Sequence, residues 1–387
     1  MHSTRPSLLV VAALFTLAAA AKDAPSPAPP PEAKAVELVH ELGLVESPTA
    51  LRELPGWRAP RRIVMATGNP NGTGAREQQE ALQGVAPGVE VVTVADADGL
   101  LKEVANADAI IGGDDTVCDE RVLAAARRLR WVAVMSAGVE ACLGKPALEK
   151  PGLVVTNMRA VAGPVMAEHT LALMFALSRS LQVSVGRQAT GEGWNRNFSG
   201  SPPQALTDKT LLVAGLGGIG TEVARRAHAL GMKVIATRNS SHEGPDYVSY
   251  VGLSDELPTL IGQADVVVSA LPLVPATTRL FDAKMFSRMK KTAYFINVGR
   301  GGSVVTDDLV AALNAGTIAG AGLDVTEPEP LPRDHPLWKA KNIIITPHMS
   351  ALSDLGQAAR MMLLREQVRR FAAGDKLLSV VDFRKGY

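Results

Sequence analysis

The sequence has little of several features that would narrow its function at once. Only two cysteines occur among 387 residues, and no CxxC or HxxxH spacing accompanies them, so we expect no metal site. The formal net charge is +1, which gives no electrostatic case for nucleic acid or an anionic membrane as a partner. What is abundant, 47% hydrophobic residues and 35 glycines, is typical of a soluble α/β protein, and the length predicts two domains.

Long apolar runs are also scarce. The run from Leu8 to Ala21 follows Arg5 and ends in small residues, and it is too short to span a bilayer comfortably. This pattern predicts that residues 1–21 are a signal peptide and that the protein is exported to the periplasm or secreted, with no membrane span in the mature chain. The alternative is an uncleaved tail or a misread start on a cytoplasmic protein. Residues 22–60 are expected to form a Pro/Ala-rich linker and an extra helix that begins near residue 33.

From Arg61 onward, short β-rich runs alternate with segments long enough for crossover helices, which is typical of parallel sheets. Five such runs come first: "RIVMAT", "VEVVTV", "ADAIIGG", "RWVAVMS" and "LVVTNM". After one long apolar helix, "VMAEHTLALMFALSRSLQVSVGRQ", come six more: "TLLVAGLG", "KVIAT", "DVVVSAL", "AYFINV", "AGAGLDV" and "NIIIT". We therefore predict an α/β fold of two doubly wound parallel-sheet domains. Residues 61–175 and 352–387 would form a flavodoxin-like substrate domain, and residues 176–351 a Rossmann domain that binds NAD(P).

A glycine-rich turn opens the second series. In "GLGGIG", Gly215, Gly217 and Gly220 match GxGxxG between an apolar strand and a helix, a context in which the backbone can approach a pyrophosphate at a helix N terminus. Where a carboxylate for the ribose hydroxyls of NAD is usual, the chain has Arg238, which would attract the 2′-phosphate of NADP. We predict a preference for NADP(H). NAD(H) is the alternative if Arg238 is only a solvated loop residue.

Further cofactor contacts are expected on the loops that follow the strands of this domain. The predicted residues are Gly218, Ile219, Asn239, Ser240, Leu271, Pro272, Val298, Gly299, Asp324 and Ser350.

Three chemically active side chains follow three successive strands of the second series. Arg300 follows "AYFINVG", Glu329 follows "GLDVTEP" and His348 follows "NIIITP". Hydride transfer to a ketone leaves negative charge on oxygen, so an adjacent acid must deliver a proton, and histidine titrates near neutrality. A carboxylate would fix the histidine tautomer, and an arginine could grip a substrate carboxylate with paired hydrogen bonds.

These segments resemble the D-2-hydroxyacid dehydrogenase family. "INVGRGG", "AGAGLDVTEPEPLP", "HPLW" and "IIITPHMS" look like its signature segments, in family order, and the resemblance runs from about Arg61 to Tyr387. It implies that Arg300 binds the substrate carboxylate and carbonyl, that Glu329, favoured over Glu327, orients the base, and that His348 is the acid/base. The family commonly has a bulkier residue than Thr326.

The resemblance also covers the first domain. "MSAGVEA" resembles the substrate loop of the family, which implies that backbone amides around Gly138 and Val139 meet the substrate carboxylate. It further implies that the two domains close over the substrate and that the protein is a homodimer.

The predicted reaction is hydride transfer between NAD(P)H and a small 2-keto acid of the glyoxylate, hydroxypyruvate or pyruvate class. Two alternatives stay open: a non-catalytic nucleotide-binding sensor or partner-binding protein, and a dehydrogenase of phosphite or another oxyanion. Cys118 and Cys142 could form a disulfide in an exported protein. His169 is expected to be a packed structural group, and His242 could approach the nucleotide phosphate.

Overall fold

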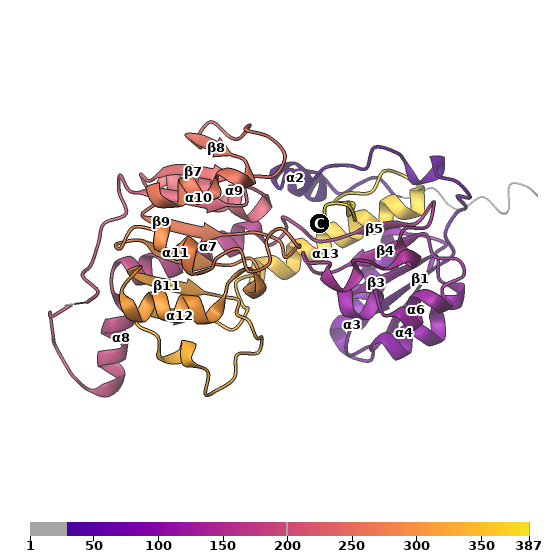
Figure 1. Ribbon diagram of the computed structural model, residues 1–387. Coiled ribbons are helices and arrows are strands. Elements are labelled where there is room, and N and C mark those ends of the chain that lie inside the picture. Colours follow the sequence, from indigo (N-terminus) through magenta and orange to yellow (C-terminus); the bar gives the residue numbers. More distant parts are fainter. Residues whose placement is uncertain (1–28, 199, 387) are drawn as a thin grey trace, which may run out of the picture.

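The computed structural model describes residues 29–198 and 200–386. They form two lobes side by side, each built on one parallel sheet (Figure 1). Residues 1–21, the predicted signal peptide, lie outside the described residues. Within the described part of the chain, no helix is both long and apolar enough to cross a membrane.

The first lobe contains the five predicted strands in the order β2-β1-β3-β4-β5, which is the flavodoxin-like order. Their bounds are β1 Arg62–Ala66, β2 Glu90–Val94, β3 Ala109–Gly112, β4 Trp131–Val134 and β5 Val154–Thr156. Helices cover both faces, so every residue of β3 and β4 is buried. One face packs on α3 (Thr73–Val85) and α13 (Asp354–Ala373), and the other on α4 (Ala97–Glu103) and α6 (Glu120–Ala125).

The second lobe contains seven strands in the order β12-β11-β10-β9-β6-β7-β8, all parallel. Their bounds are β6 Thr210–Ala214, β7 Lys233–Thr237, β8 Tyr250–Gly252, β9 Val266–Ser269, β10 Tyr294–Asn297, β11 Gly320–Leu323 and β12 Ile343–Ile345. The expected count of six was wrong, because β8 is only three residues long and extends the sheet edge beside β7. The doubly wound topology itself is confirmed.

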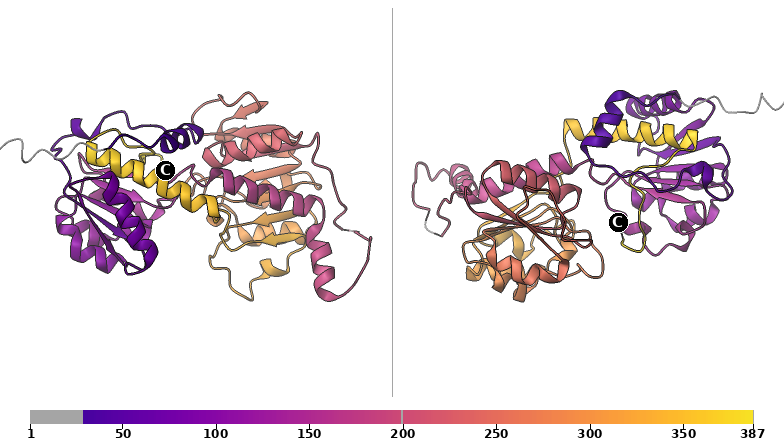
Figure 2. Two further views of the ribbon diagram at one scale, coloured as in Figure 1. Left: turned by 180° about the vertical axis from the view of Figure 1, so that it is seen from behind. Right: turned by 90° about the horizontal axis from the view of Figure 1, so that it is seen from above.

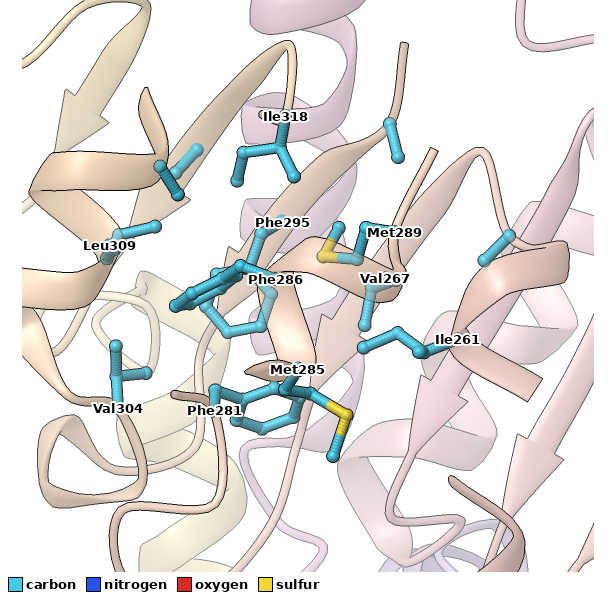
Figure 3. Close-up of a cluster of buried hydrophobic side chains, with 14 of the residues drawn as sticks. Ile261, Val267, Phe281, Met285, Phe286, Met289, Phe295, Val304, Leu309 and Ile318 are labelled. Carbon is cyan, nitrogen blue, oxygen red and sulfur yellow. The ribbon is translucent and has the colours of Figure 1, made fainter. Parts of the chain in front are cut away.

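Helices also cover both faces of the seven-stranded sheet. α7 (Gly163–Ser178) and α9 (Gly218–Ala229) pack on one face through an aliphatic cluster. The other face carries α10 (Leu257–Leu260), α11 (Ala283–Arg288) and α12 (Thr306–Ala315). Three aromatic rings, Phe281, Phe286 and Phe295, meet at the centre of that second cluster (Figure 3). The domain boundary expected after residue 175 therefore falls inside α7, which packs on the seven-stranded sheet.

The long apolar segment before this sheet is two helices rather than the single helix predicted. α7 ends at Ser178, and α8 (Leu181–Thr190) starts after Ser180, which adopts the left-handed conformation at φ 56°. The fully buried Ser180 side chain donates a hydrogen bond from Oγ to the Ser201 carbonyl at 2.5 Å. This buried bond fixes the break, and α8 projects away from its lobe (Figure 1).

The C-terminal helix returns to the first lobe, as expected. α13 begins beside the second lobe and runs along the first (Figure 2), where Leu364, Val368 and Phe371 pack with Trp131 and Ile63. α2 (Ala33–Glu41) provides the expected extra N-terminal helix and lies against α13, with an ion pair between Glu32 and Arg365.

A disulfide joins Cys118 and Cys142, the pairing that the sequence left open. Cys118 ends the short helix α5 (Asp114–Val117), and Cys142 ends the 3₁₀ turn Glu140–Cys142 that follows β4. Both cysteines are buried in the first lobe, so the disulfide ties together the segments that follow β3 and β4.

Candidate active site

The three predicted catalytic side chains lie at the carboxyl ends of adjacent strands. Arg300 follows β10, Glu329 follows β11 and His348 follows β12, and these strands pair in the order β12-β11-β10. The first two loops touch: a Cβ atom on Gly301 would lie 1.9 Å from the Thr326 carbonyl oxygen, so only glycine fits there. The sheet thus brings the three loops to one edge.

His348 and Glu329 form a direct pair. Nδ1 of His348 lies 2.5 Å from Oε1 of Glu329, and both side chains are partly exposed. This contact occupies Nδ1 and leaves Nε2 for a substrate. The other acid considered, Glu327, is instead near Gly302, where a Cβ would lie 3.8 Å from Oε2 of Glu327. The structure therefore brings Glu329, and not Glu327, to the imidazole.

Asp324 holds the loop that carries His348. Its buried carboxylate accepts hydrogen bonds from the amides of Met349 and Ser350 and from Oγ1 of Thr346, and its backbone carbonyl accepts one from the amide of His348. Burial acts to raise the pKa of Asp324, but hydrogen bonds from Thr346 and from the amides of Met349 and Ser350 outweigh it and lower the pKa. The carboxylate thus stays ionised and fixes the loop.

His169, expected to be a packed structural group, extends this network. Its Nε2 lies 2.9 Å from Oγ1 of Thr346, and Thr346 donates its hydroxyl proton to Asp324 at 2.7 Å. Nε2 of His169 must therefore be the donor to Thr346. The result is a continuous hydrogen-bonded chain from α7, through Thr346, to the carboxylate that holds the His348 loop.

Arg300 lies where the two lobes meet. Its Nη1 donates to the Gly299 carbonyl at 2.8 Å, and its Nε donates to Oε1 of Glu140 in the first lobe at 2.8 Å. Gly138, a predicted substrate contact, is covered by this pair, because a Cβ there would lie 2.1 Å from Nη2 of Arg300. The adjacent Val139 has a buried side chain, so only its backbone could meet a substrate.

The three motif glycines have distinct environments. Gly215 has φ +98°, and a Cβ there would lie 2.9 Å from the Ala270 carbonyl oxygen. A Cβ on Gly220 would lie 2.1 Å from the Gly215 carbonyl oxygen and 2.9 Å from Val213. Gly217, by contrast, has open space around its Cβ position, and no side chain caps the N terminus of α9. This cradle fits a pyrophosphate, which the helix amides would bind.

Arg238 stands directly after β7, as the sequence placed it. Its backbone amide donates to the Gly252 carbonyl, Nη1 donates to the Glu243 carbonyl at 2.9 Å, and its buried Nε has no hydrogen-bond partner among the described residues. Asn239 and Ser240 beside it are exposed. Arg238 thus places a cationic side chain beside exposed polar groups at this end of the sheet.

The remaining predicted cofactor residues lie on the same edge. Leu271 and Pro272 follow β9, and a Cβ on Gly299 would lie 2.6 Å from the Leu271 carbonyl oxygen, so the two loops are in contact. The Val298 and Ser350 side chains are buried, while Gly218 and Ile219 open α9. His242 is held by a hydrogen bond between Nδ1 and the Val251 carbonyl. No group of three His, Cys, Asp or Glu side chains among the described residues could hold a metal.

Sequence reasoning missed two contributors to this site, Glu140 and Thr346. Glu140 directly follows the predicted Gly138 and Val139, but its partner Arg300 is 160 positions away, so no local pattern could pair them. Thr346 stands two positions before His348 in "IIITPHMS", and only the fold shows that it links His169 to Asp324.

Together, the doubly wound sheet, its glycine turn and the Arg, Glu and His side chains beside it define a nicotinamide-dependent oxidoreductase. The family model described as "D-isomer specific 2-hydroxyacid dehydrogenase, NAD binding domain" matches residues 171–350. The human glyoxylate reductase/hydroxypyruvate reductase is 36% identical over 238 residues, which is 60% of this chain and 71% of that relative. The chain belongs to the D-isomer specific 2-hydroxyacid dehydrogenase family.

Solved structures agree with this membership. A D-isomer specific 2-hydroxyacid dehydrogenase family protein from Aeromonas salmonicida has a TM-score of 0.71 and 30% identity and covers 84% of this chain and 100% of its own. A family member from Xanthobacter autotrophicus in complex with NADPH and MES has a TM-score of 0.71, 28% identity and coverages of 85% and 100%. The chain spans only 55% of the D-3-phosphoglycerate dehydrogenase from Methanocaldococcus jannaschii, at 32% identity.

Proposed function

We propose that the protein reduces a small 2-keto acid to its D-2-hydroxy acid, with NADPH as the preferred cofactor. The observation that carries this proposal is the 2.5 Å contact between His348 and Glu329 on the loop edge that also bears Arg300. Bound NADPH would supply a hydride to the carbonyl carbon. Nε2 of His348 would donate a proton to the carbonyl oxygen, since Glu329 holds Nδ1.

In the same proposal, Arg300 grips the substrate carboxylate and polarises the carbonyl with its charged N–H groups. The backbone of Gly138 and Val139 closes the carboxylate site from the first lobe. The substrates we expect are glyoxylate, hydroxypyruvate and pyruvate.

A panel assay of the protein lacking residues 1–21 tests this directly. Consumption of NADPH and of NADH would be followed with each of the three keto acids, and turnover with at least one supports the proposal. Tight binding of NADPH without turnover of any keto acid would contradict the proposed reductase activity. It would favour the alternative, a non-catalytic nucleotide-binding sensor.

The cofactor preference rests on Arg238, because an arginine at the end of the second strand attracts a 2′-phosphate where a carboxylate would repel it. A lost charge-assisted contact costs ~1.5 to 3 kcal/mol, so we expect Arg238→Ala to weaken NADPH binding by roughly tenfold to a hundredfold. NADH binding should change little. Fluorescence titration of both cofactors measures this, with Arg225→Ala on α9 as the control arginine.

Equal losses for NADPH and NADH in Arg238→Ala would show that the arginine recognises the shared adenosine. Arg238→Asp adds repulsion to the lost attraction, and we expect it to shift the preference further toward NADH.

We also propose that the protein is exported. The Cys118–Cys142 disulfide supports this, since such bonds persist in oxidising compartments, and the pattern of residues 1–21 supports it independently. Sequencing of the N terminus from the native host should begin near Lys22. A chain that retains Met1 and fractionates with cytosolic markers would contradict export.

A homodimer is the proposed assembly. α8 buries none of its residues, and Leu181, Val185 and the nearby Trp194 are exposed on this projecting arm, which is the kind of apolar surface that partners cover. Light scattering should give twice the chain mass, and Val185→Asp should shift the protein toward monomer. A wild-type protein that is monomeric at micromolar concentration would contradict the proposal.

A further inference from the structure

A carboxylate of the protein itself already engages the arginine proposed to bind the substrate carboxylate. Glu140 opens the 3₁₀ turn after β4, and its Oε1 accepts a hydrogen bond from Nε of Arg300 at 2.8 Å. The pair joins the two lobes, and both side chains are about one-third exposed, at 36% for Glu140 and 28% for Arg300. The pair is therefore open to solvent in part.

The geometry around Arg300 leaves little room for a second carboxylate. Nη1 donates to the carbonyl of the neighbouring Gly299, which belongs to the same loop and cannot be displaced independently. Both Nη2 of Arg300 and Oε2 of Glu140 lie over Gly138, where a Cβ would be 2.1 Å from the first and 2.3 Å from the second. A substrate carboxylate that takes a paired hydrogen bond from Nε and Nη2 of Arg300 must displace Glu140, because Glu140 already accepts from Nε.

Glu140 also stands in an acidic corner. Burial raises the pKa of the neighbouring Asp114, and the charges of Asp115 and Glu140 act in the same direction. Ala141, the residue after Glu140, donates its amide to Asp114. Among the described residues, Arg300 is the only cationic ion-pair partner of Glu140, so we expect the charge of a displaced Glu140 to remain beside the bound substrate.

We infer that Glu140 is a specificity-determining residue: it competes with the substrate carboxylate for Arg300 and penalises substrates that carry a second carboxylate. This inference rests on the proposed role of Arg300. It predicts selectivity for monocarboxylic keto acids over dicarboxylic ones, because the displaced Glu140 repels the additional negative charge.

The test compares Glu140→Gln with wild type and with Glu149→Gln, an exposed acid on the same segment. Calorimetry measures the binding of oxamate, with one carboxylate, and of oxalate, with two, to the full chain saturated with NADPH. A partly exposed ion pair that must be broken lowers affinity by roughly two- to fivefold. We expect Glu140→Gln to tighten oxamate by that factor, to tighten oxalate by more, and to lower the KM for pyruvate, while Glu149→Gln matches wild type.

Unchanged or weaker binding of both probes in Glu140→Gln would overturn the inference and make Glu140 a residue that positions Arg300. Absence of binding of either probe to both proteins would overturn it as well. Failure of the proposed function is distinguishable, because the binding experiment needs no turnover. If wild type is inactive but Glu140→Gln still binds oxalate more tightly than wild type, the reductase activity is refuted. The competition between Glu140 and the ligand carboxylate for Arg300 is then still supported.

Discussion

His348 combines a reactive ring with an unusual backbone. Its φ is 50°, a left-handed conformation that non-glycine residues rarely adopt, and its amide donates to the carbonyls of Asp324 and Thr346. Backbone strain of this kind is tolerated where surrounding contacts enforce it, and it concentrates at functional sites. The loop therefore holds the backbone of His348, and the contact between Nδ1 and Oε1 of Glu329 holds the ring.

Replacement of His348 by asparagine separates chemistry from folding, because asparagine accepts the left-handed conformation well. We expect His348→Asn to lower kcat by at least ~100-fold, the size typical of a positioned acid, with NADPH affinity near normal. Steady-state kinetics and cofactor titration measure the two effects. Turnover close to wild type would remove His348 from the proton-donor role.

The two acids of the "TEPEP" segment provide a matched pair. Glu329→Gln removes the charge beside Nδ1 of His348, and we expect a large loss of kcat because the imidazolium loses its partner. Glu327→Gln should leave kcat nearly unchanged, since Glu327 lies toward Gly302 instead. Equal losses in the two variants would contradict the assignment of Glu329.

At the scale of the element, the glycine turn before α9 contains one glycine with open space around it, Gly217, and one that is tightly packed, Gly220. A methyl group on Gly217 meets nothing within 4 Å, whereas one on Gly220 would lie 2.1 Å from the Gly215 carbonyl oxygen. We expect Gly217→Ala to keep the wild-type melting temperature but to weaken NADPH, because the methyl group occupies the pyrophosphate cradle. Gly220→Ala should lower both. Unchanged NADPH affinity in Gly217→Ala would place the pyrophosphate elsewhere.

The loop held by Asp324 should have a characteristic pH dependence. The lowered pKa of Asp324 means that its carboxylate adds stability that is fully present above the ordinary aspartate range and is lost as pH falls through the lowered pKa. We expect Asp324→Asn to melt below wild type near neutral pH, and the difference to shrink in acid. Thermal scans from about pH 7 to about pH 3 measure this, and a constant difference would contradict it.

The helices and strands differ in how well the sequence predicts them. Periodicity identified the five strands of the first lobe because each is a short apolar run. It missed β8, since Tyr250–Gly252 is short and has an exposed first residue. It also merged α7 with α8, because the apolar pattern continues through Ser180 and only the distant Ser201 carbonyl explains the break. The Glu140–Arg300 pair depends on how the two lobes meet, which local patterns do not encode.

For the whole molecule, the disulfide is the only covalent tie beyond the backbone among the described residues. Its cysteines are 24 positions apart, and closing a loop of this size adds about 3 kcal/mol of stability in the chain-entropy model. We expect the Cys118→Ser, Cys142→Ser double variant to melt at a lower temperature than the oxidised protein. Calorimetry in the absence of reductant measures the shift. Labelling of both thiols in native, unreduced protein would contradict the disulfide itself.

Both cysteines belong to the lobe that carries Glu140, so we expect the absence of their bond to affect this lobe and not the nucleotide-binding sheet. Synthesis in a reducing host would yield a folded nucleotide-binding lobe beside a first lobe that lacks the Cys118–Cys142 disulfide. NADPH binding would then look normal in a preparation whose substrate loop is not yet held in place. Measurement of free thiols, rather than of cofactor affinity, therefore shows whether the disulfide has formed in a recombinant sample.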